Sequence, residues 1–130
     1  MPSIFSKIVS GDIPCHKVHE DENFLAFLDI NPLAMGHTLV IPKKEVDYIF
    51  DLDDDTLGAL HIFSKKVARA IESVIECERI GVTVIGLEVP HAHVHLIPIT
   101  GVADMNFERP KLSPEQSELA EVAKKISNAI

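Results

Sequence analysis

Three histidines at alternate positions are the residues of this sequence that could most readily do chemistry. His91, His93 and His95 lie within five residues, in the segment between Pro90 and Pro98. Successive side chains of an extended strand point to opposite faces, so the three imidazole rings are predicted to line one face, with neighbours about 6.6–6.8 Å apart along the strand. The other face would carry apolar side chains that a helix can cover, namely Ala92, Val94 and Leu96.

A row of imidazole rings allows three interpretations. An imidazole with a pKa near its reference value of about 6.5 can be neutral and nucleophilic at pH 7 while its neighbour donates a proton. Alternate histidines could instead bind zinc or another divalent cation and leave one position open for catalysis. Strand neighbours are rather far apart for one ion, however, and no carboxylate or cysteine stands beside the row. The third interpretation is a strand that carries solvated histidines without a chemical role.

Composition narrows the class of protein. The chain has 130 residues, with 12 Lys and Arg against 20 Asp and Glu and a formal net charge of −8. This length fits one domain over residues 1–130. A nucleic-acid partner is not expected, because such binding normally requires a basic face. Cys15 and Cys77 are too few for a disulfide framework or a Cys-x-x-Cys metal site. We see no signal peptide and no run of 18 apolar residues, and therefore expect a cytoplasmic protein without a membrane partner.

The elements that must position the histidines follow from the hydrophobic pattern. Apolar or β-rich runs bounded by turn residues predict strands over 16–20, 24–30, 37–41, 82–85 and 89–97. Apolar residues at spacings of three and four predict a long central helix that opens at 53–55, in a segment ended by Gly81.

Two further helices and a loop complete the expected architecture. Ser3 is predicted to cap a short helix over 4–9, and Ser113 to begin a C-terminal helix over about 114–129. Segment 100–112 shows the weakest pattern, and we expect it to be a mobile loop. The order of elements favours an α+β fold, with about five mainly antiparallel strands covered on one face by helices.

Several segments of the sequence resemble a known family. The run from His91 to Ile97, with apolar residues between and after the histidines, looks like the signature of the histidine triad (HIT) superfamily. The resemblance extends to 4–14, to 24–32 and to 36–43, and covers residues 4 to about 98 in all. These segments are most similar to the histidine triad nucleotide-binding branch. The resemblance implies a HIT-like fold.

The resemblance also implies a reaction at phosphorus. HIT proteins of this kind are nucleotide-handling hydrolases or transferases, and His93 would be the nucleophile that attacks the α-phosphorus to form a covalent nucleotidyl-histidine. His91 and His37 are the family's orienting partners, and His95 would contact the phosphate oxygens. No metal or other cofactor is implied.

A nucleoside pocket is carried over in the same way. Asp29 matches the carboxylate that accepts the ribose hydroxyls, and Ile30 lies next to the base. The family's apolar pocket positions correspond to Phe5, Ile8, Ile13 and Phe27. Buried core is a serious alternative for these four, and a turn residue is the alternative for Asp29. The implied partners are a purine nucleotide and a second copy of the chain in a homodimer.

The sequence departs from the family before the triad. Many members carry Gly-Gln-Ser or Gly-Gln-Thr there, whereas this chain has Gly86, Leu87 and Glu88. Leu87 cannot form a hydrogen bond, and an ionised Glu88 would repel a phosphate unless it turned away. The side of the site that meets the leaving group is therefore expected to differ. Two alternative functions stay open: a zinc-dependent hydrolase that uses the same histidines, and a nucleotide-binding protein without catalytic activity.

Overall fold

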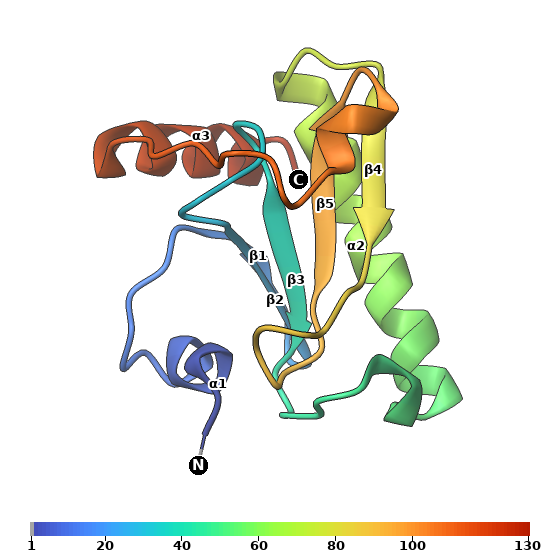
Figure 1. The fold of residues 1–130 in the computed structure, drawn as a ribbon. Coiled ribbons are helices and arrows are strands. Elements are labelled where there is room, and N and C mark those ends of the chain that lie inside the picture. Colours follow the sequence, from blue (N-terminus) through green and yellow to red (C-terminus); the bar gives the residue numbers. More distant parts are fainter. Residues whose placement is uncertain (1) are drawn as a thin grey trace.

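The computed structural model describes residues 2–130, and its centre is one five-stranded sheet. The strands follow the order β1-β2-β3-β5-β4, and all neighbours are antiparallel (Figure 1). The strands are β1 (Lys17–Glu20), β2 (Phe24–Leu28), β3 (Thr38–Pro42), β4 (Arg79–Thr83) and β5 (Val94–Ile99). The helices are α1 (Ile4–Val9), α2 (Asp54–Val74) and α3 (Gln116–Asn128), with short 3-10 turns at Ile49–Asp51 and Val102–Met105. The predicted α+β class is confirmed.

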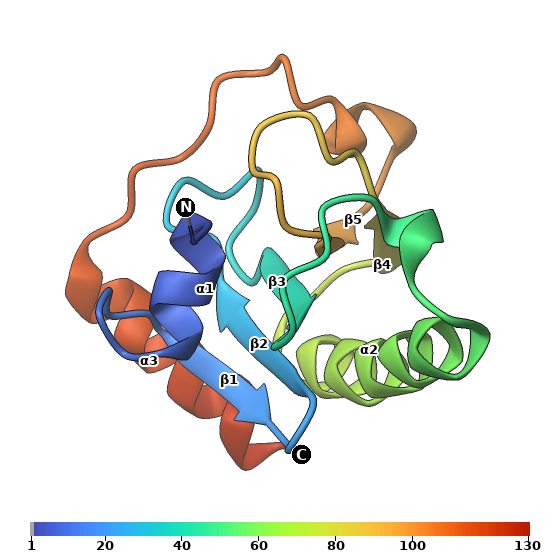
Figure 2. The same cartoon turned by 90° about the horizontal axis from the view of Figure 1, so that it is seen from below.

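The two faces of the sheet carry two different cores. Phe24, Ala26 and Leu28 alternate along β2 with Leu25 and Phe27, as strand geometry requires. The first set packs with buried side chains of α2 and α3, and the second packs with α1. In Figure 2, α2 and α3 lie on one side of the sheet, and α1 lies on the other side with the long loops. The face opposite α2 and α3 is therefore the one free to build a site.

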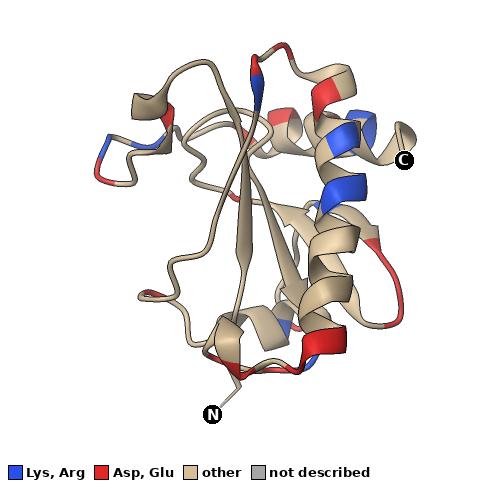
Figure 3. Ribbon diagram, turned by 90° about the vertical axis from the view of Figure 1, so that its right-hand side faces the viewer, with Lys and Arg blue, Asp and Glu red and all other residues tan. Residues whose placement is uncertain are grey.

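The capping residues explain where the helices begin. The Ser3 hydroxyl accepts a hydrogen bond from the Ser6 amide at 3.0 Å, as predicted for the start of α1. Asp53 accepts one from the Thr56 amide at 2.7 Å and begins α2. Figure 3 shows acidic residues at the start of α2, where they suit the positive end of the helix dipole, and basic residues in its middle. No helix within residues 2–130 is both long and apolar enough to cross a membrane.

Some predicted boundaries were wrong. α2 ends at Val74, and Gly81 lies inside β4 instead of ending the helical segment. α3 starts at Gln116 with Glu115 as its N-cap, two residues later than predicted, because the Glu118 side chain accepts from the Glu115 amide and closes the capping box there.

The largest correction concerns the strand of the histidines. β5 begins at Val94, so His91 and His93 lie in the loop before it and not in a strand over 89–97. The backbone there bonds elsewhere: the His91 amide donates to the Val89 carbonyl at 2.8 Å, and the Ala92 amide donates to the Val46 carbonyl at 2.7 Å. Ladder pairing with β3 starts only at Val94. Ala92, Val94 and Leu96 nevertheless pack in the core under the helices, as predicted.

Candidate active site

Three imidazole rings meet on the face of the sheet opposite α2 and α3. His95 lies on β5, His93 precedes it, and His37 directly precedes β3. The ring centroids of His93 and His95 are 4.9 Å apart, and those of His37 and His95 are 5.2 Å apart. All three rings are buried. His93 and His95 are two residues apart in the chain, whereas His37 comes from just before β3. His37 reaches the cluster because β3 pairs directly with β5.

His93 has one ring nitrogen committed and one free. Its Nδ1 lies 2.7 Å from the main-chain carbonyl oxygen of His91. A carbonyl oxygen only accepts, so Nδ1 carries the proton, and a neutral ring then has its lone pair on Nε2. His93 lines the pocket described below. The hydrogen bond therefore presents a nucleophilic nitrogen in a fixed orientation.

The His91 ring is held away from this cluster. Its Nε2 lies 2.7 Å from the Pro42 carbonyl oxygen, and its Nδ1 lies 2.8 Å from the Ser3 hydroxyl. His91 is completely buried and is not among the residues that line the pocket. The prediction that all three rings of the triad line one face is thus wrong for His91, because strand alternation does not extend to it. His91 contacts His93 through its main-chain carbonyl, which accepts the hydrogen bond from Nδ1 of His93.

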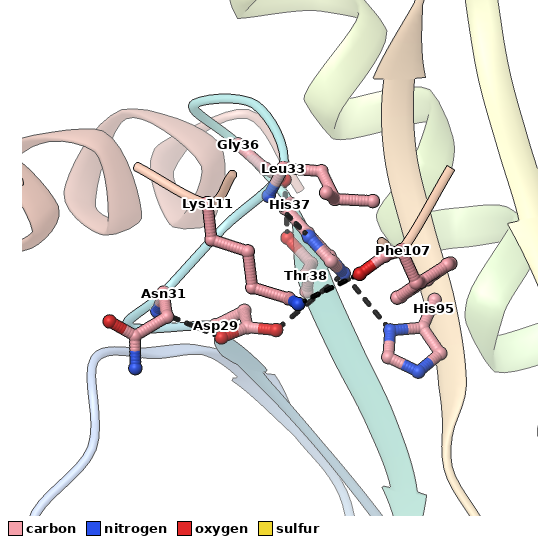
Figure 4. Close-up of polar contacts among 9 residues, drawn as sticks. All are labelled: Asp29, Asn31, Leu33, Gly36, His37, Thr38, His95, Phe107 and Lys111. Atoms are coloured by element: carbon pink, nitrogen blue, oxygen red, sulfur yellow. Dashed lines mark hydrogen bonds and ion pairs between the residues drawn. The ribbon is translucent and has the colours of Figure 1, made fainter. Parts of the chain in front are cut away.

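His37 and His95 form a hydrogen-bonded chain with a defined direction (Figure 4). The Leu33 amide donates to Nδ1 of His37 at 3.1 Å, so a neutral His37 carries its proton on Nε2. That Nε2–H lies 3.0 Å from Nδ1 of His95, which must accept. Burial lowers the pKa of His37 to about 4 and that of His95 to about 3, so both rings are neutral at pH 7. His95 is left with its Nε2–H as a donor for a ligand.

Asp29 stands at the end of β2, beside this chain. Its amide donates to the His37 carbonyl at 3.0 Å, one carboxylate oxygen accepts from the Asn31 amide at 2.9 Å, and the other lies 3.7 Å from Nε2 of His37 (Figure 4). Burial raises the pKa of the Asp29 carboxyl, and its hydrogen bond with Asn31 and the Lys111 charge partly offset this. Asp29 thus forms an Asx turn, which agrees with its interpretation as a turn residue. Its second carboxylate oxygen is still available to accept a hydrogen bond from a ligand.

The histidines and Asp29 open into one cavity of about 260 Å³. Every pocket residue inferred from the sequence lines it, namely Phe5, Ile8, Ile13, Phe27, Asp29, Ile30 and Glu88. His93 and His95 line it too, whereas His37 and His91 lie behind them. Phe5 and Phe27 are also buried members of the second core cluster, so the pocket and core interpretations both hold for these two. The cavity combines an apolar wall with a polar end.

The comparisons with known proteins agree with this arrangement. The HIT domain family matches residues 10–101. The chain belongs to the HIT family. It is 43% identical to the protein hit of Bacillus subtilis over 108 residues, covering 78% of this chain and 73% of that protein. It is 42% identical to the adenosine 5′-monophosphoramidase hnt1 of Schizosaccharomyces pombe over 100 residues, covering 75% of this chain and 74% of that protein.

Solved structures of HIT proteins share the fold. A HIT-like protein from Bartonella henselae superposes with a TM-score of 0.85 at 34% identity, covering 98% of this chain and 96% of that chain. A Zn-bound histidine triad family protein from Mycobacterium smegmatis superposes with a TM-score of 0.83 at 30% identity, covering 97% and 91%. The five-stranded antiparallel sheet with its helices is therefore the HIT fold.

In this HIT protein, a segment beyond the family match contributes to the site. The Phe107 ring packs edge-on against His95 and His37, with centroid distances of 4.7 and 6.1 Å. The Lys111 ammonium donates to the Phe107 carbonyl at 3.0 Å and lies beside Asp29 (Figure 4). The sequence offered no signal for the contacts of this segment with His37 and Asp29, because they join residues far apart in the chain. The segment predicted to be a mobile loop packs against the histidine cluster.

The polar end of the cavity also brings together three groups that could bind a metal ion. Ligand atoms of Asp29, His37 and His95 all lie within 4.8 Å of one another. The nitrogen that His37 offers is Nε2, which must carry the proton while Nδ1 accepts from the Leu33 amide. A metal at Nε2 would require the proton on Nδ1, facing an N–H group. The hydrogen bonds of His37 therefore do not suit metal binding.

Proposed function

We propose that this chain is a nucleotide hydrolase that transfers a nucleoside monophosphate group from a leaving group to His93, and then to water. The observation that carries the proposal is the free Nε2 of His93, held by a 2.7 Å bond at Nδ1, in the same cavity as His95 and Asp29. Family membership and the relative named adenosine 5′-monophosphoramidase support the nucleotide as substrate.

The reaction would proceed in two displacements. Nε2 of His93 attacks the α-phosphorus, a P–N bond forms, and the bond to the leaving group breaks; the leaving group departs with the electron pair and takes up a proton from solvent. The Nδ1–H bond to the His91 carbonyl stabilises the positive charge that develops on the ring. Water then attacks phosphorus, loses a proton and releases His93 and the nucleoside monophosphate.

His95 would stabilise the phosphorus centre as a hydrogen-bond donor. Its Nδ1 accepts from His37, so its Nε2–H can donate to a phosphoryl oxygen. A low pKa of about 3 makes this donor a neutral imidazole at pH 7. A hydrogen-bond donor that is held where negative charge develops in the transition state is usually a large source of rate enhancement in such sites.

The nucleoside would occupy the apolar part of the cavity. Phe5, Ile8, Ile13 and Phe27 offer apolar surface to a base, and a purine is the base we propose. The free oxygen of Asp29 would accept the ribose hydroxyls, because an ionised carboxylate only accepts. This places the sugar between the base and the phosphorus.

The leaving group is proposed to be an amine. Glu88 lines the cavity close to His93 in sequence, while Leu87 is 88% exposed and does not line it. A carboxylate on this side repels an anionic leaving group and tolerates a neutral or cationic one. Phosphoramidates are therefore preferred over dinucleoside polyphosphates in this proposal.

The deciding experiment is capture of the intermediate. The protein is mixed with adenosine 5′-phosphoramidate near neutral pH and quenched in denaturant at alkaline pH, where a P–N bond to imidazole survives, and intact mass and peptide mapping locate any nucleotidyl adduct. We expect the adduct on His93 and none in His93→Ala. Dinucleoside polyphosphates serve as the competing substrate class. Normal turnover by His93→Ala would reject the nucleophile, and tight nucleotide binding without turnover of any substrate would instead support the non-catalytic function that Leu87 and Glu88 suggest.

The chain is further proposed to form a homodimer. Among the described strands, β4 pairs with β5 alone and leaves one edge open. Exposed apolar side chains gather there and nearby, namely Tyr48, Phe50, Val82 and Ile85. An open edge with an apolar border suits pairing with a second copy. Light scattering after size-exclusion chromatography tests this, and a monomer at micromolar concentration would reject it.

A further inference from the structure

A hydrogen-bonded cluster outside the cavity ties the N-terminus of the chain to the histidine loop. The Glu45 carboxylate accepts from the Ser3 amide at 2.6 Å and from the Ser6 hydroxyl at 2.7 Å. The Ser3 hydroxyl accepts from the Ser6 amide at 3.0 Å and lies 2.8 Å from Nδ1 of His91. These four residues come from α1, the segment after β3 and the loop before β5. We name them the N-terminal clasp.

The direction of each bond in the clasp is determined. The Pro42 carbonyl oxygen can only accept, so the His91 nitrogen that faces it at 2.7 Å, Nε2, must donate. A neutral His91 therefore has its lone pair on Nδ1, and the Ser3 hydroxyl must donate to it. The Ser3 hydroxyl keeps its own proton for this bond, because in its other hydrogen bond it accepts the proton of the Ser6 amide. The Pro42 carbonyl thus selects the tautomer of this completely buried ring, and the Ser3 hydroxyl holds the ring through the lone pair on Nδ1.

The clasp reaches His93 through the main chain of His91. The carbonyl of His91 accepts the Nδ1–H of His93 at 2.7 Å and so sets which nitrogen of His93 is free. Phe5 of α1 packs edge-on against both rings, with centroid distances of 5.9 Å to His91 and 5.0 Å to His93. A rotation of the His91 ring or a shift of α1 would therefore move the carbonyl that orients His93.

We propose that Ser3, held by Ser6 and Glu45, is a positioning residue that fixes His91 and thereby the attacking nitrogen of His93. This inference rests on the proposed function for its catalytic consequence, but its structural part concerns His91 alone. A small displacement of a reacting atom lowers the rate of a positioned reaction strongly. Loss of Ser3 should therefore reduce kcat and leave KM nearly unchanged, because the clasp does not line the cavity.

The experiment compares three variants on the full chain. Ser3→Ala removes the donor to His91 together with the N-cap of α1. Ser3→Thr keeps both, since threonine also caps helices. Asp53→Ala removes the N-cap of α2 instead and serves as the matched control for loss of a cap alone. The readouts are kcat and KM with adenosine 5′-phosphoramidate, and the ¹⁵N chemical shifts of the histidine rings, which report the tautomer.

We expect His91 to be the Nε2–H tautomer and His93 the Nδ1–H tautomer in the parent chain. In Ser3→Ala, kcat should fall about 10-fold and the ¹⁵N shift of His91 Nδ1 should move, because this nitrogen loses its hydrogen-bond donor while the Pro42 carbonyl keeps the proton on Nε2. Ser3→Thr should restore most of both, and Asp53→Ala should change neither. An Nδ1–H tautomer of His91 in the parent, or a loss in Ser3→Ala no larger than in Asp53→Ala, would overturn the inference. Absence of turnover in the parent would count against the proposed function, while the ¹⁵N shifts would still test the clasp.

Discussion

The Phe107 ring lies edge-on against the His95 ring, with centroids 4.7 Å apart. Phe107 belongs to a segment beyond residue 101, where the family match ends. The Leu112 amide donates to the Pro32 carbonyl at 2.9 Å and holds this segment over the end of the sheet. Part of the environment of the histidine cluster therefore lies outside the family match.

Removal of Phe107 should hydrate His95. In Phe107→Ala, water reaches the ring, and the pKa of His95 should rise from about 3 toward its ordinary value of about 6.5. Turnover should fall roughly 3- to 10-fold, because the donor to phosphorus becomes less ordered. NMR titration of the His95 ring and steady-state kinetics check this. Phe50→Ala, which truncates a 70% exposed ring, is the control; an unchanged His95 titration in Phe107→Ala would refute the shielding.

Replacement of His93 should abolish turnover. His93→Ala removes the proposed nucleophile, and a loss of about 10³-fold or more is expected because no covalent intermediate can form. His61→Ala is the matched control, since His61 is exposed on α2 and bonds the Leu57 carbonyl. Steady-state rates with a phosphoramidate measure both. Residual activity above one tenth of the parent in His93→Ala would contradict the assignment.

Neutralisation of Asp29 should weaken binding of the sugar. Asp29→Asn keeps the oxygen that accepts from the Asn31 amide but loses the ionised acceptor proposed for the ribose hydroxyls. KM should rise about 10-fold, and the preference for ribonucleotides over 2′-deoxy analogues should decrease. Kinetics with both substrates decide this, with Asp51→Asn as an exposed control. A KM equal to that of the parent would remove Asp29 from the nucleoside site.

Acid should destabilise the fold through His37 and His95. Their pKa values of about 4 and about 3 lie below the value of about 6.5 for an unfolded histidine. Between these values the unfolded chain binds more protons, so the free energy of unfolding decreases as pH falls from about 6.5 to about 3. The raised pKa of Asp29 acts in the opposite sense at acid pH, since the folded chain then binds the extra proton.

Urea unfolding at pH 7 and pH 5 measures this effect. We expect the free energy of unfolding to be lower at pH 5 by roughly 4 kcal/mol, about 2 kcal/mol from each ring. The double variant H37N/H95N lacks both buried rings and should show a weaker pH dependence over the same window. His61→Ala should retain the dependence of the parent. An equal slope in the double variant and the parent would show that other groups cause the acid sensitivity.

Chelation should leave turnover unchanged. The Leu33 amide occupies Nδ1 of His37 and keeps the proton on the nitrogen that a metal would need. Prolonged dialysis against a strong chelator, followed by kinetics and elemental analysis, tests this expectation. If activity were lost with zinc and returned on its addition, the zinc-dependent alternative would replace the metal-free mechanism.

Local pattern was enough to predict the elements of this fold. The apolar stripe of α2, the cap at Ser3 and the apolar run that forms β2 are short-range properties, and each was confirmed. Errors arose where tertiary bonds decide a boundary. The carbonyls of Val89 and Val46 accept from the amides of His91 and Ala92, so the strand begins later, at Val94, than the sequence suggests.

The sequence by itself determined which side chains are available: the three alternating histidines, His37, Asp29 and the apolar residues that line one cavity. Only the tertiary structure decided their protonation and orientation. Those depend on the Pro42 carbonyl, the Leu33 amide and the Ser3 hydroxyl, which reach the rings through long-range packing or local turns. A hydrogen bond selects a tautomer only when its partner lies within about 3 Å, and no pattern of residue types specifies such a distance.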